Sequence, residues 1–143
     1  MPTLSAAVAA AGSSLTAQRV RLEAAVSNLA NAESTRGADG KPYRRRDVVL
    51  QTADVASFDQ TLSRVNGAVG VKVAAVLEDQ EPFKRRYEPS HPDADAEGFV
   101  QLPNVDPAEE MVDMLSAARA YQANLTAINL IRDLVQRALE LGR

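Results

Sequence analysis

Apolar residues recur in the first part of the chain at spacings that alternate between four and three residues. The positions are Leu4, Val8, Ala11, Leu15, Gln18, Leu22, Ala25, Leu29 and Ala32, and only Gln18 is polar. This is the heptad pattern of a helix that packs along one narrow seam. Such a helix, about 45 Å long for about thirty residues, cannot bury its seam alone. The pattern therefore predicts an N-terminal helix over residues 1–36 that needs a partner helix.

A second long helix is predicted over residues 105–143. Asp106 can cap it, Pro107 suits the first helical position, and Glu109 has the spacing of a capping box. The apolar seam then follows Met111, Met114, Ala118, Tyr121, Leu125 and Ile128. Because both seams need covering, each arm is the obvious partner of the other.

The segment between the arms, residues 37–104, holds five of the seven prolines, and no proline falls within 3–41 or 108–143. Short β-branched stretches predict strands at 44–52 and 71–77, a further short strand is expected at 99–102, and a turn at 38–40. Residues 54–67 fit either a short helix or an irregular loop. We therefore predict an α+β fold, in which the long terminal helices pair as an antiparallel coiled coil beside a small, mostly β middle module.

Composition narrows this picture. The chain has 143 residues, enough for one domain, and 45% of them are hydrophobic but only 4% aromatic. Much of the apolar content is alanine, which favours narrow helix seams over a large core. The net charge of -3 argues against a general binder of nucleic acid or anionic membranes. The first basic residue is Arg19, so the start lacks the basic region of a cleaved signal peptide.

Two basic clusters, 44–46 and 84–86, have acidic residues close by in the sequence. A nucleic-acid patch would need a basic surround. We therefore interpret the clusters as a solvated rim or as salt-bridging groups at a protein interface. The helices could also lie on a membrane surface, but the N-terminal arm has few basic residues and no bulky aromatic anchor, which favours protein partners.

Candidate chemistry is sparse. Asp93, Asp95, Glu97 and Gly98 imitate the start of a calcium-binding EF-hand loop, but the twelfth position is Asn104 instead of the bidentate Glu. His91 is the only histidine, and the chain has no cysteine. We expect an acidic surface loop with His91 in a turn, no catalytic residue, and no cofactor or metal.

The stretch VSNLANAESTRG, residues 26–37, ends the first helical pattern with small polar side chains. Asn28 and Asn31 share a helix face and lie beside the seam at Leu29. Gln18 interrupts the same seam, and polar residues at such positions set register at some cost in stability. We expect Gln18, Asn28, Asn31 and Arg36 to make polar contacts at an interface between subunits. An intramolecular hairpin serving only this chain's own fold is the simpler alternative.

Several blocks resemble the axial proteins of the bacterial flagellum. Residues 14–49 are similar to the N-terminal signature shared by flagellar rod and hook proteins. GKPYRRR at 40–46, residues 88–130 and the ending RALELGR are similar to the proximal-rod protein C subfamily. With the strands between them, the resemblance extends over nearly the whole chain.

The resemblance implies a non-enzymatic structural subunit of the proximal rod, the shaft that transmits torque from the motor ring to the hook. Such subunits leave the cell unfolded through the flagellar type III export channel, without a cleaved signal peptide, and assemble by helix packing in the periplasm. The implied partners are copies of itself, the other proximal rod proteins, the rod base adaptor and the first distal rod protein. Neither nucleic-acid binding nor direct membrane insertion is implied.

Within this hypothesis the seam residues form the packing interface; they are Leu15, Leu22, Leu29, Met111, Met114, Tyr121, Leu125 and Ile128. Isolated heptad arms are marginal, so residues 1–35 and 105–143 are expected to be poorly ordered or promiscuously paired in a dilute monomer. The alternatives are a helical-hairpin adaptor or export-system component that makes finite complexes, and an enzyme or calcium-binding domain built on residues 88–104.

Overall fold

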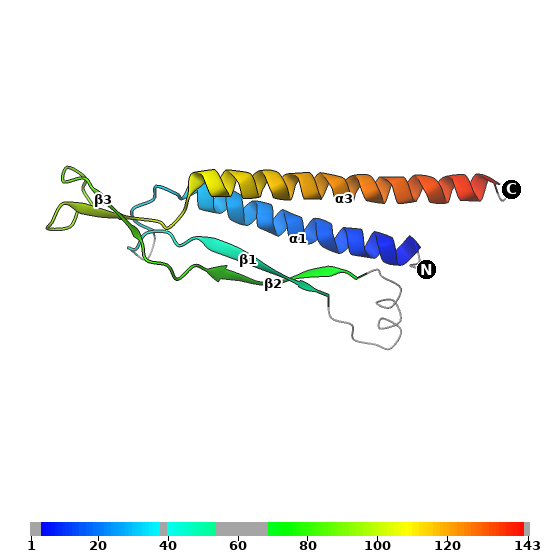
Figure 1. Ribbon diagram of the computed structural model, residues 1–143, viewed down its shortest axis with the longest axis horizontal. Coiled ribbons are helices and arrows are strands. Elements are labelled where there is room, and N and C mark those ends of the chain that lie inside the picture. Colours follow the sequence, from blue (N-terminus) through cyan, green and yellow to red (C-terminus); the bar gives the residue numbers. More distant parts are fainter. Residues whose placement is uncertain (1–3, 38–39, 54–68, 142–143) are drawn as a thin grey trace.

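The computed structural model describes residues 4–37, 40–53 and 69–141. Two long helices, α1 (Leu4–Ala30) and α3 (Pro107–Leu141), lie side by side and run in opposite directions (Figure 1). The described residues between them form the strands β1 (Arg46–Thr52), β2 (Val71–Glu78), β3 (Lys84–Tyr87) and β4 (Phe99–Leu102). The α+β fold with paired terminal helices is confirmed.

The two helices approach closely because small side chains lie between them. Ala17 and Ala25 of α1 and Ala117 of α3 are each almost completely buried. Polar pairs mark the antiparallel alignment along the helices: Asn28 contacts Glu110 near one end, and Ser14 contacts Asn124 farther along. At 35 residues against 27, α3 is the longer helix, and its C-terminal end extends past α1 in Figure 1.

Both helix boundaries at the junction with the middle segment have a local cause. The Asp106 carboxylate accepts the N–H of Ala108 at 2.9 Å, which confirms the predicted N-terminal cap of α3. The apolar spacing continues to Ala32, but α1 ends at Ala30. There the Asn31 amide donates to the Ser27 carbonyl, and the Ser34 hydroxyl donates to the Asn31 carbonyl. Such side-chain bonds compete with the helical backbone pattern and end it.

The described middle segment forms two separate antiparallel pairs of strands. β1 pairs with β2 along α1, and a bulge leaves Ala74 opposite no residue, because Val49 pairs with Ala75 and Leu50 with Val73. β3 pairs with β4 and projects from the junction end of the helices (Figure 1).

The predicted strand at 44–52 begins two residues later than expected, at Arg46, and the strand at 99–102 is confirmed. β3, with the sequence KRRY, was missed because it lacks an alternating apolar pattern. The alternatives for residues 54–67 lie outside the described residues.

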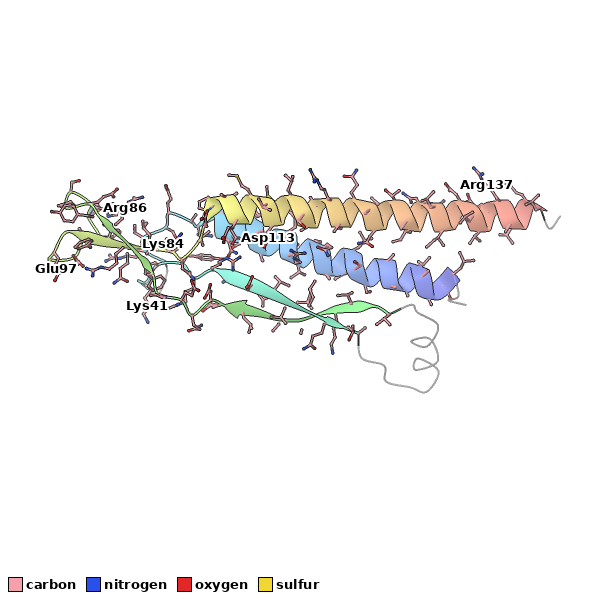
Figure 2. The ribbon with its side chains drawn as sticks, in the orientation of Figure 1. Lys41, Lys84, Arg86, Glu97, Asp113 and Arg137 are labelled. Carbon is pink, nitrogen blue, oxygen red and sulfur yellow. The ribbon has the colours of Figure 1, made fainter. Side chains whose placement is uncertain are left out.

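The core of the described residues is small and partly polar. Val100, Pro103 and Val105 are buried beside the start of α3, and Asn28 and Glu110 are among the largest fully buried side chains. Many side chains project into solvent along the whole length of α3 (Figure 2). Large apolar residues that stay exposed on this helix include Met111, Val112, Leu115, Leu125, Leu130, Leu134 and Leu139.

Candidate functional site

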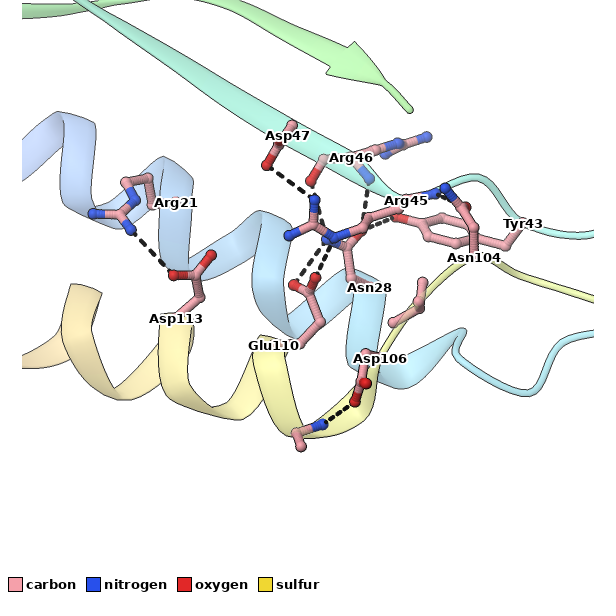
Figure 3. Close-up of polar contacts among 12 residues, drawn as sticks. Arg21, Asn28, Tyr43, Arg45, Arg46, Asp47, Asn104, Asp106, Glu110 and Asp113 are labelled. Carbon is pink, nitrogen blue, oxygen red and sulfur yellow. Dashed lines mark hydrogen bonds and ion pairs between the residues drawn. The ribbon is translucent and has the colours of Figure 1, made fainter. Parts of the chain in front are cut away.

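The most concentrated set of polar contacts joins α1, α3 and the start of β1; we call it the polar junction, formed by Asn28, Tyr43, Arg45, Glu110 and the backbone of Arg46 (Figure 3). Asn28 is 1% exposed and Glu110 is 2% exposed. The Asn28 Nδ2 group donates to Glu110 Oε2 at 2.9 Å and to the Arg46 carbonyl at 3.0 Å. One buried amide therefore links both helices to the first strand.

The oxygen of the same amide is also satisfied. Asn28 Oδ1 accepts the Arg46 N–H at 2.9 Å and the Tyr43 hydroxyl at 3.0 Å. Asn28 thus both donates to and accepts from the backbone of Arg46, as a neighbouring strand would. This pairing fixes where β1 begins relative to α1, because a shift of one residue would leave a buried amide without partners.

The buried carboxylate of Glu110 is balanced by the partly buried cation of Arg45. Arg45 Nε donates to Glu110 Oε1, and Arg45 Nη1 lies 3.4 Å from Asp47. Burial lowers the pKa of Arg45, but the hydrogen bond to Glu110 and the charges of Glu110, Asp47 and Asp79 outweigh it, so the net shift is upward. The guanidinium therefore stays charged at any physiological pH.

The polar junction is a structural contact. Each Glu110 oxygen accepts a hydrogen bond, and the Arg45 cation neutralises its charge, so the carboxylate is not presented to a substrate. In the described part of the chain, no group of three or more His, Asp or Glu side chains could hold a metal ion. The polar junction holds three elements in one relative position.

The acidic loop that resembles an EF-hand is built from local hydrogen bonds. Asp95 Oδ1 accepts the N–H groups of Phe99 at 2.8 Å and Glu97 at 3.0 Å, and Gly98 adopts a positive φ of 82° between them. The Phe99 N–H, the Glu97 N–H and Arg85 together lower the pKa of Asp95 against the opposing effect of desolvation. The Asp95 carboxylate therefore stabilises the folded conformation of the loop.

The loop is also tied to the end of the VSNLANAESTRG stretch. Asp93 accepts the Thr35 hydroxyl at 2.8 Å and lies 3.4 Å from Arg36. His91 Nδ1 accepts the Asp93 N–H at 3.1 Å within the turn.

The structure places the expected seam residues at different depths. Leu15, Leu22 and Leu29 of α1, and Met114 and Ile128 of α3, are partly buried. Met111, Tyr121 and Leu125 are 51%, 37% and 44% exposed. The residues of α3 that are best shielded by α1 are Glu110 and Ala117. Contacts of the seam residues with other subunits stay a prediction.

The four expected register residues are also spread out. Gln18 accepts a hydrogen bond from Arg21 on the same helix, and Arg36 is exposed beside Asp93. Asn31 lies in the turn after α1, where its amide bonds to Ser27. Asn28 is buried in the polar junction, so an intersubunit contact from it, which stays a prediction, would require the helices to separate.

Sequence reasoning missed Glu110, Arg45 and Tyr43 as members of one cluster. A signal was present, since Glu110 lies four residues before Met114 and seven before Ala117, on the packed side of the helix. A charged residue at such a position implies a buried partner.

In the described part of the chain, neither helix has the length and apolar character needed to cross a membrane.

Residues 96–141 match the family model described as the C-terminal part of the flagellar basal body rod FlgEFG proteins. This match includes β4, the N-terminal cap of α3 and all of α3.

Curated relatives match over most of the chain. The flagellar basal-body rod protein FlgC of Salmonella typhimurium is 48% identical over 133 residues, which cover 93% of each chain. FlgC of Bacillus subtilis is 46% identical over 140 residues, 92% of this chain and 93% of its own. FlgC of Borreliella burgdorferi is 40% identical over 141 residues, 92% of each chain. These relatives are named as components of the rod, and this chain belongs to the FlgC family of flagellar basal-body rod proteins.

Proposed function

We propose that this chain is a non-enzymatic structural subunit of the proximal rod, which assembles by helix packing between subunits and carries torque from the motor ring to the hook. The observation that carries the proposal is the apolar surface of α3 left uncovered within the chain. Met111, Val112 and Leu115 are 51%, 69% and 52% exposed on its first turns. Leu130, Leu134 and Leu139 are 58%, 61% and 68% exposed farther along the helix.

An apolar surface of this length is typical of a helix that meets further helices in an assembly. Together with Ser116 and Arg119, the first three of these residues also line a shallow apolar groove of about 410 Å³. The expected seam residues Met111, Tyr121 and Leu125 belong to this exposed set. They are therefore available to a neighbouring subunit without any change in the fold.

The proposed partners are further copies of this chain, the other proximal rod proteins, the rod base adaptor and the first distal rod protein. Assembly takes place in the periplasm after export through the flagellar type III channel without a cleaved signal peptide. The register contacts are assigned to Gln18, Asn31 and Arg36, with Asn28 contributing only if the polar junction opens. Residues 1–36, 37–104 and 105–143 form the N-terminal helical part, the middle module and the C-terminal helical part.

The test replaces residues on the proposed interface in a strain that lacks its own copy of the protein. Asn31→Leu is expected to reduce the amount of protein in isolated basal bodies and the swimming speed, while the free energy of unfolding of the monomer changes less. Leu115→Ser serves as a second variant on α3. Unaffected motility and normal incorporation of both variants would contradict the assigned interface.

The same preparations separate this function from its rival, a helical-hairpin adaptor. An adaptor forms finite complexes of fixed stoichiometry and is absent from the axial structure. A rod subunit is found within it, at a position that image reconstruction of the basal body identifies.

A further inference from the structure

Two neighbouring stretches of the sequence line one cleft in the structure. The cleft has a volume of about 400 Å³ and lies beside the turn that follows α1. Asn31, Ser34 and Arg36 of the VSNLANAESTRG stretch form one side. Lys41, Arg44 and Arg46 of the GKPYRRR block form another, and we call this site the basic cleft.

The charge of the basic cleft is opposite to that of the chain. Arg36, Lys41, Arg44 and Arg46 line it, and Glu78 is the one carboxylate among the lining residues that the structure describes. The complete chain carries a net charge of -3. A concave site lined by one sign of charge concentrates the field and attracts groups of the opposite sign. The basic cleft therefore favours an anionic occupant.

The cationic side chains are held on a shaped backbone. The Gly37 N–H donates to the Lys41 carbonyl at 2.7 Å, and Gly40 has a positive φ of 76°, which closes the turn that carries Lys41. Arg44 donates to the Asp79 carbonyl at 2.9 Å, and its guanidinium lies 4.5 Å from the Phe83 ring centroid.

The other two arginines lie nearer to solvent. The Arg46 side chain is exposed, with its guanidinium 5.7 Å from the centroid of the Tyr43 ring. The Arg36 side chain is 67% exposed, and it lies 3.4 Å from Asp93, whose side chain is 22% exposed. These two cations can turn toward an incoming carboxylate.

We propose that the basic cleft binds an acidic segment of a neighbouring rod subunit, an inference that rests on the proposed function. The mixed lining suits a peptide, because Pro42, Tyr43 and Phe83 offer apolar surface for side-chain stems while the cations meet carboxylates. A nucleic acid would need an extended basic surface, whereas Asp47 directly follows Arg46 and acidic residues Asp79 and Glu81 precede the second basic cluster at 84–86. The cleft lies at the junction end of the molecule, outside the apolar surface of α3, and so adds a polar contact to the helix packing.

The direct test uses the purified full chain and a capped hexaglutamate peptide as the probe, followed by nuclear magnetic resonance of the backbone amides. We expect the peptide to shift the signals of Ser34, Gly37, Lys41 and Arg46. Binding should weaken about tenfold or more when the salt concentration rises from low to high ionic strength. The variant Lys41→Glu with Arg46→Glu should lose these shifts while keeping the other signals of the folded protein.

Arg137→Glu is the matched control, since Arg137 lies on α3 near the opposite end of the molecule (Figure 2). This variant makes the same kind of charge change and should bind the peptide as the unaltered chain does. Shifts spread over all basic residues, or equal loss of binding in the control, would overturn the proposal.

A second experiment identifies the occupant in assembled basal bodies. A photoreactive residue in place of Lys41 is expected to cross-link to an acidic segment of another rod subunit, located by mass spectrometry. Cross-links only to lipid, nucleic acid or a segment without acidic residues would refute the proposal. The amounts of this variant and of the unaltered chain in the basal bodies are measured separately. If both are absent from the basal bodies, the result contradicts the proposed rod function and not the assignment of the basic cleft.

Discussion

The two ends of the helical hairpin are built on different physical principles. At the junction end, Asn28 and Glu110 are buried and fully hydrogen-bonded, and Arg45 compensates the carboxylate charge. Toward the far end, Leu130, Leu134 and Leu139 of α3 stay exposed, and the helix extends past the start of α1 (Figure 1).

The difference separates what the chain specifies alone from what it leaves to assembly. Directional polar contacts at the junction have one satisfied arrangement, so they fix the geometry of a single subunit. An exposed apolar helix surface is non-directional and can be covered by any helix of suitable shape. Substitutions at the junction should therefore act on folding, and substitutions at the far end should act on assembly.

The largest effect is expected from Glu110→Ala. It leaves the Arg45 cation without its buried partner and removes the acceptor of the Asn28 amide. Loss of one member of a buried ion pair costs about 3–5 kcal/mol. Urea unfolding of the purified monomer measures this change in the free energy of unfolding.

The neighbouring variant Glu109→Ala is the control, because Glu109 is exposed on the first turn of α3. It should change the free energy of unfolding by no more than about 0.5 kcal/mol. Equal effects of the two variants would show that the buried pair does not stabilise the monomer.

A smaller effect is expected from Asn28→Ala, which removes hydrogen bonds from the Arg46 backbone and from the Tyr43 hydroxyl. Leaving such buried groups unsatisfied costs about 1–3 kcal/mol. Asn31→Ala is the matched variant three residues later, and its amide bonds only within the turn in the described contacts. In thermal unfolding, the Tm of Asn28→Ala should be clearly lower than that of Asn31→Ala. The reverse order would show that the polar junction does not stabilise the monomer more than the turn after α1 does.

At the far end, Leu130→Ser and Leu134→Ser should change the free energy of unfolding of the monomer by less than about 0.5 kcal/mol, because both side chains are already mostly exposed. The same variants should lower incorporation into basal bodies. Marked destabilisation of the monomer by either variant would mean that this surface is covered within the chain itself.

The smallest effect is expected from acidification at the β3–β4 loop, where the Phe99 N–H, the Glu97 N–H and Arg85 lower the pKa of Asp95. Because the pKa in the folded chain is below the unfolded value, the contribution of Asp95 is complete above the unfolded value. It is lost as the pH falls through the folded value, below about pH 4. Amide signals of Phe99 should shift in that range, and Asp95→Asn should abolish the titration without unfolding the loop.

The sequence predicted the helices and most strands because their signals are local. Asp106 and Pro107 mark the start of α3 by chemistry within one turn. Phe99–Leu102 is a strand both in the sequence prediction and in the structure. β3 could not be predicted, since Lys84, Arg85 and Arg86 have little intrinsic preference for a strand and form one only by pairing with β4.

The polar junction was missed for a related reason. The large apolar side chains at Met111 and Leu125 suggested one helix face, whereas Glu110, Ala117 and Asn124 form contacts with α1 one position earlier. Both faces have heptad spacing and share Met114, Tyr121 and Ile128, so the spacing alone does not distinguish them. The expectation that both arms are poorly ordered in a dilute monomer stays a prediction, and strong, equal hydrogen-exchange protection of both arms would contradict it.

The pairing of the terminal helices has a kinetic consequence. Asn28 and Glu110 are 82 residues apart in the sequence, and Ser14 and Asn124 are 110 apart. Helical proteins usually fold fast because their contacts are local, but here the central contacts require closure of most of the chain. In sequence separation, these helix–helix contacts are therefore closer to the strand pairings of a β protein than to the contacts of a local helical bundle. The chain is expected to fold slowly for its size, so a newly made subunit should stay unfolded longer than most helical proteins of its length.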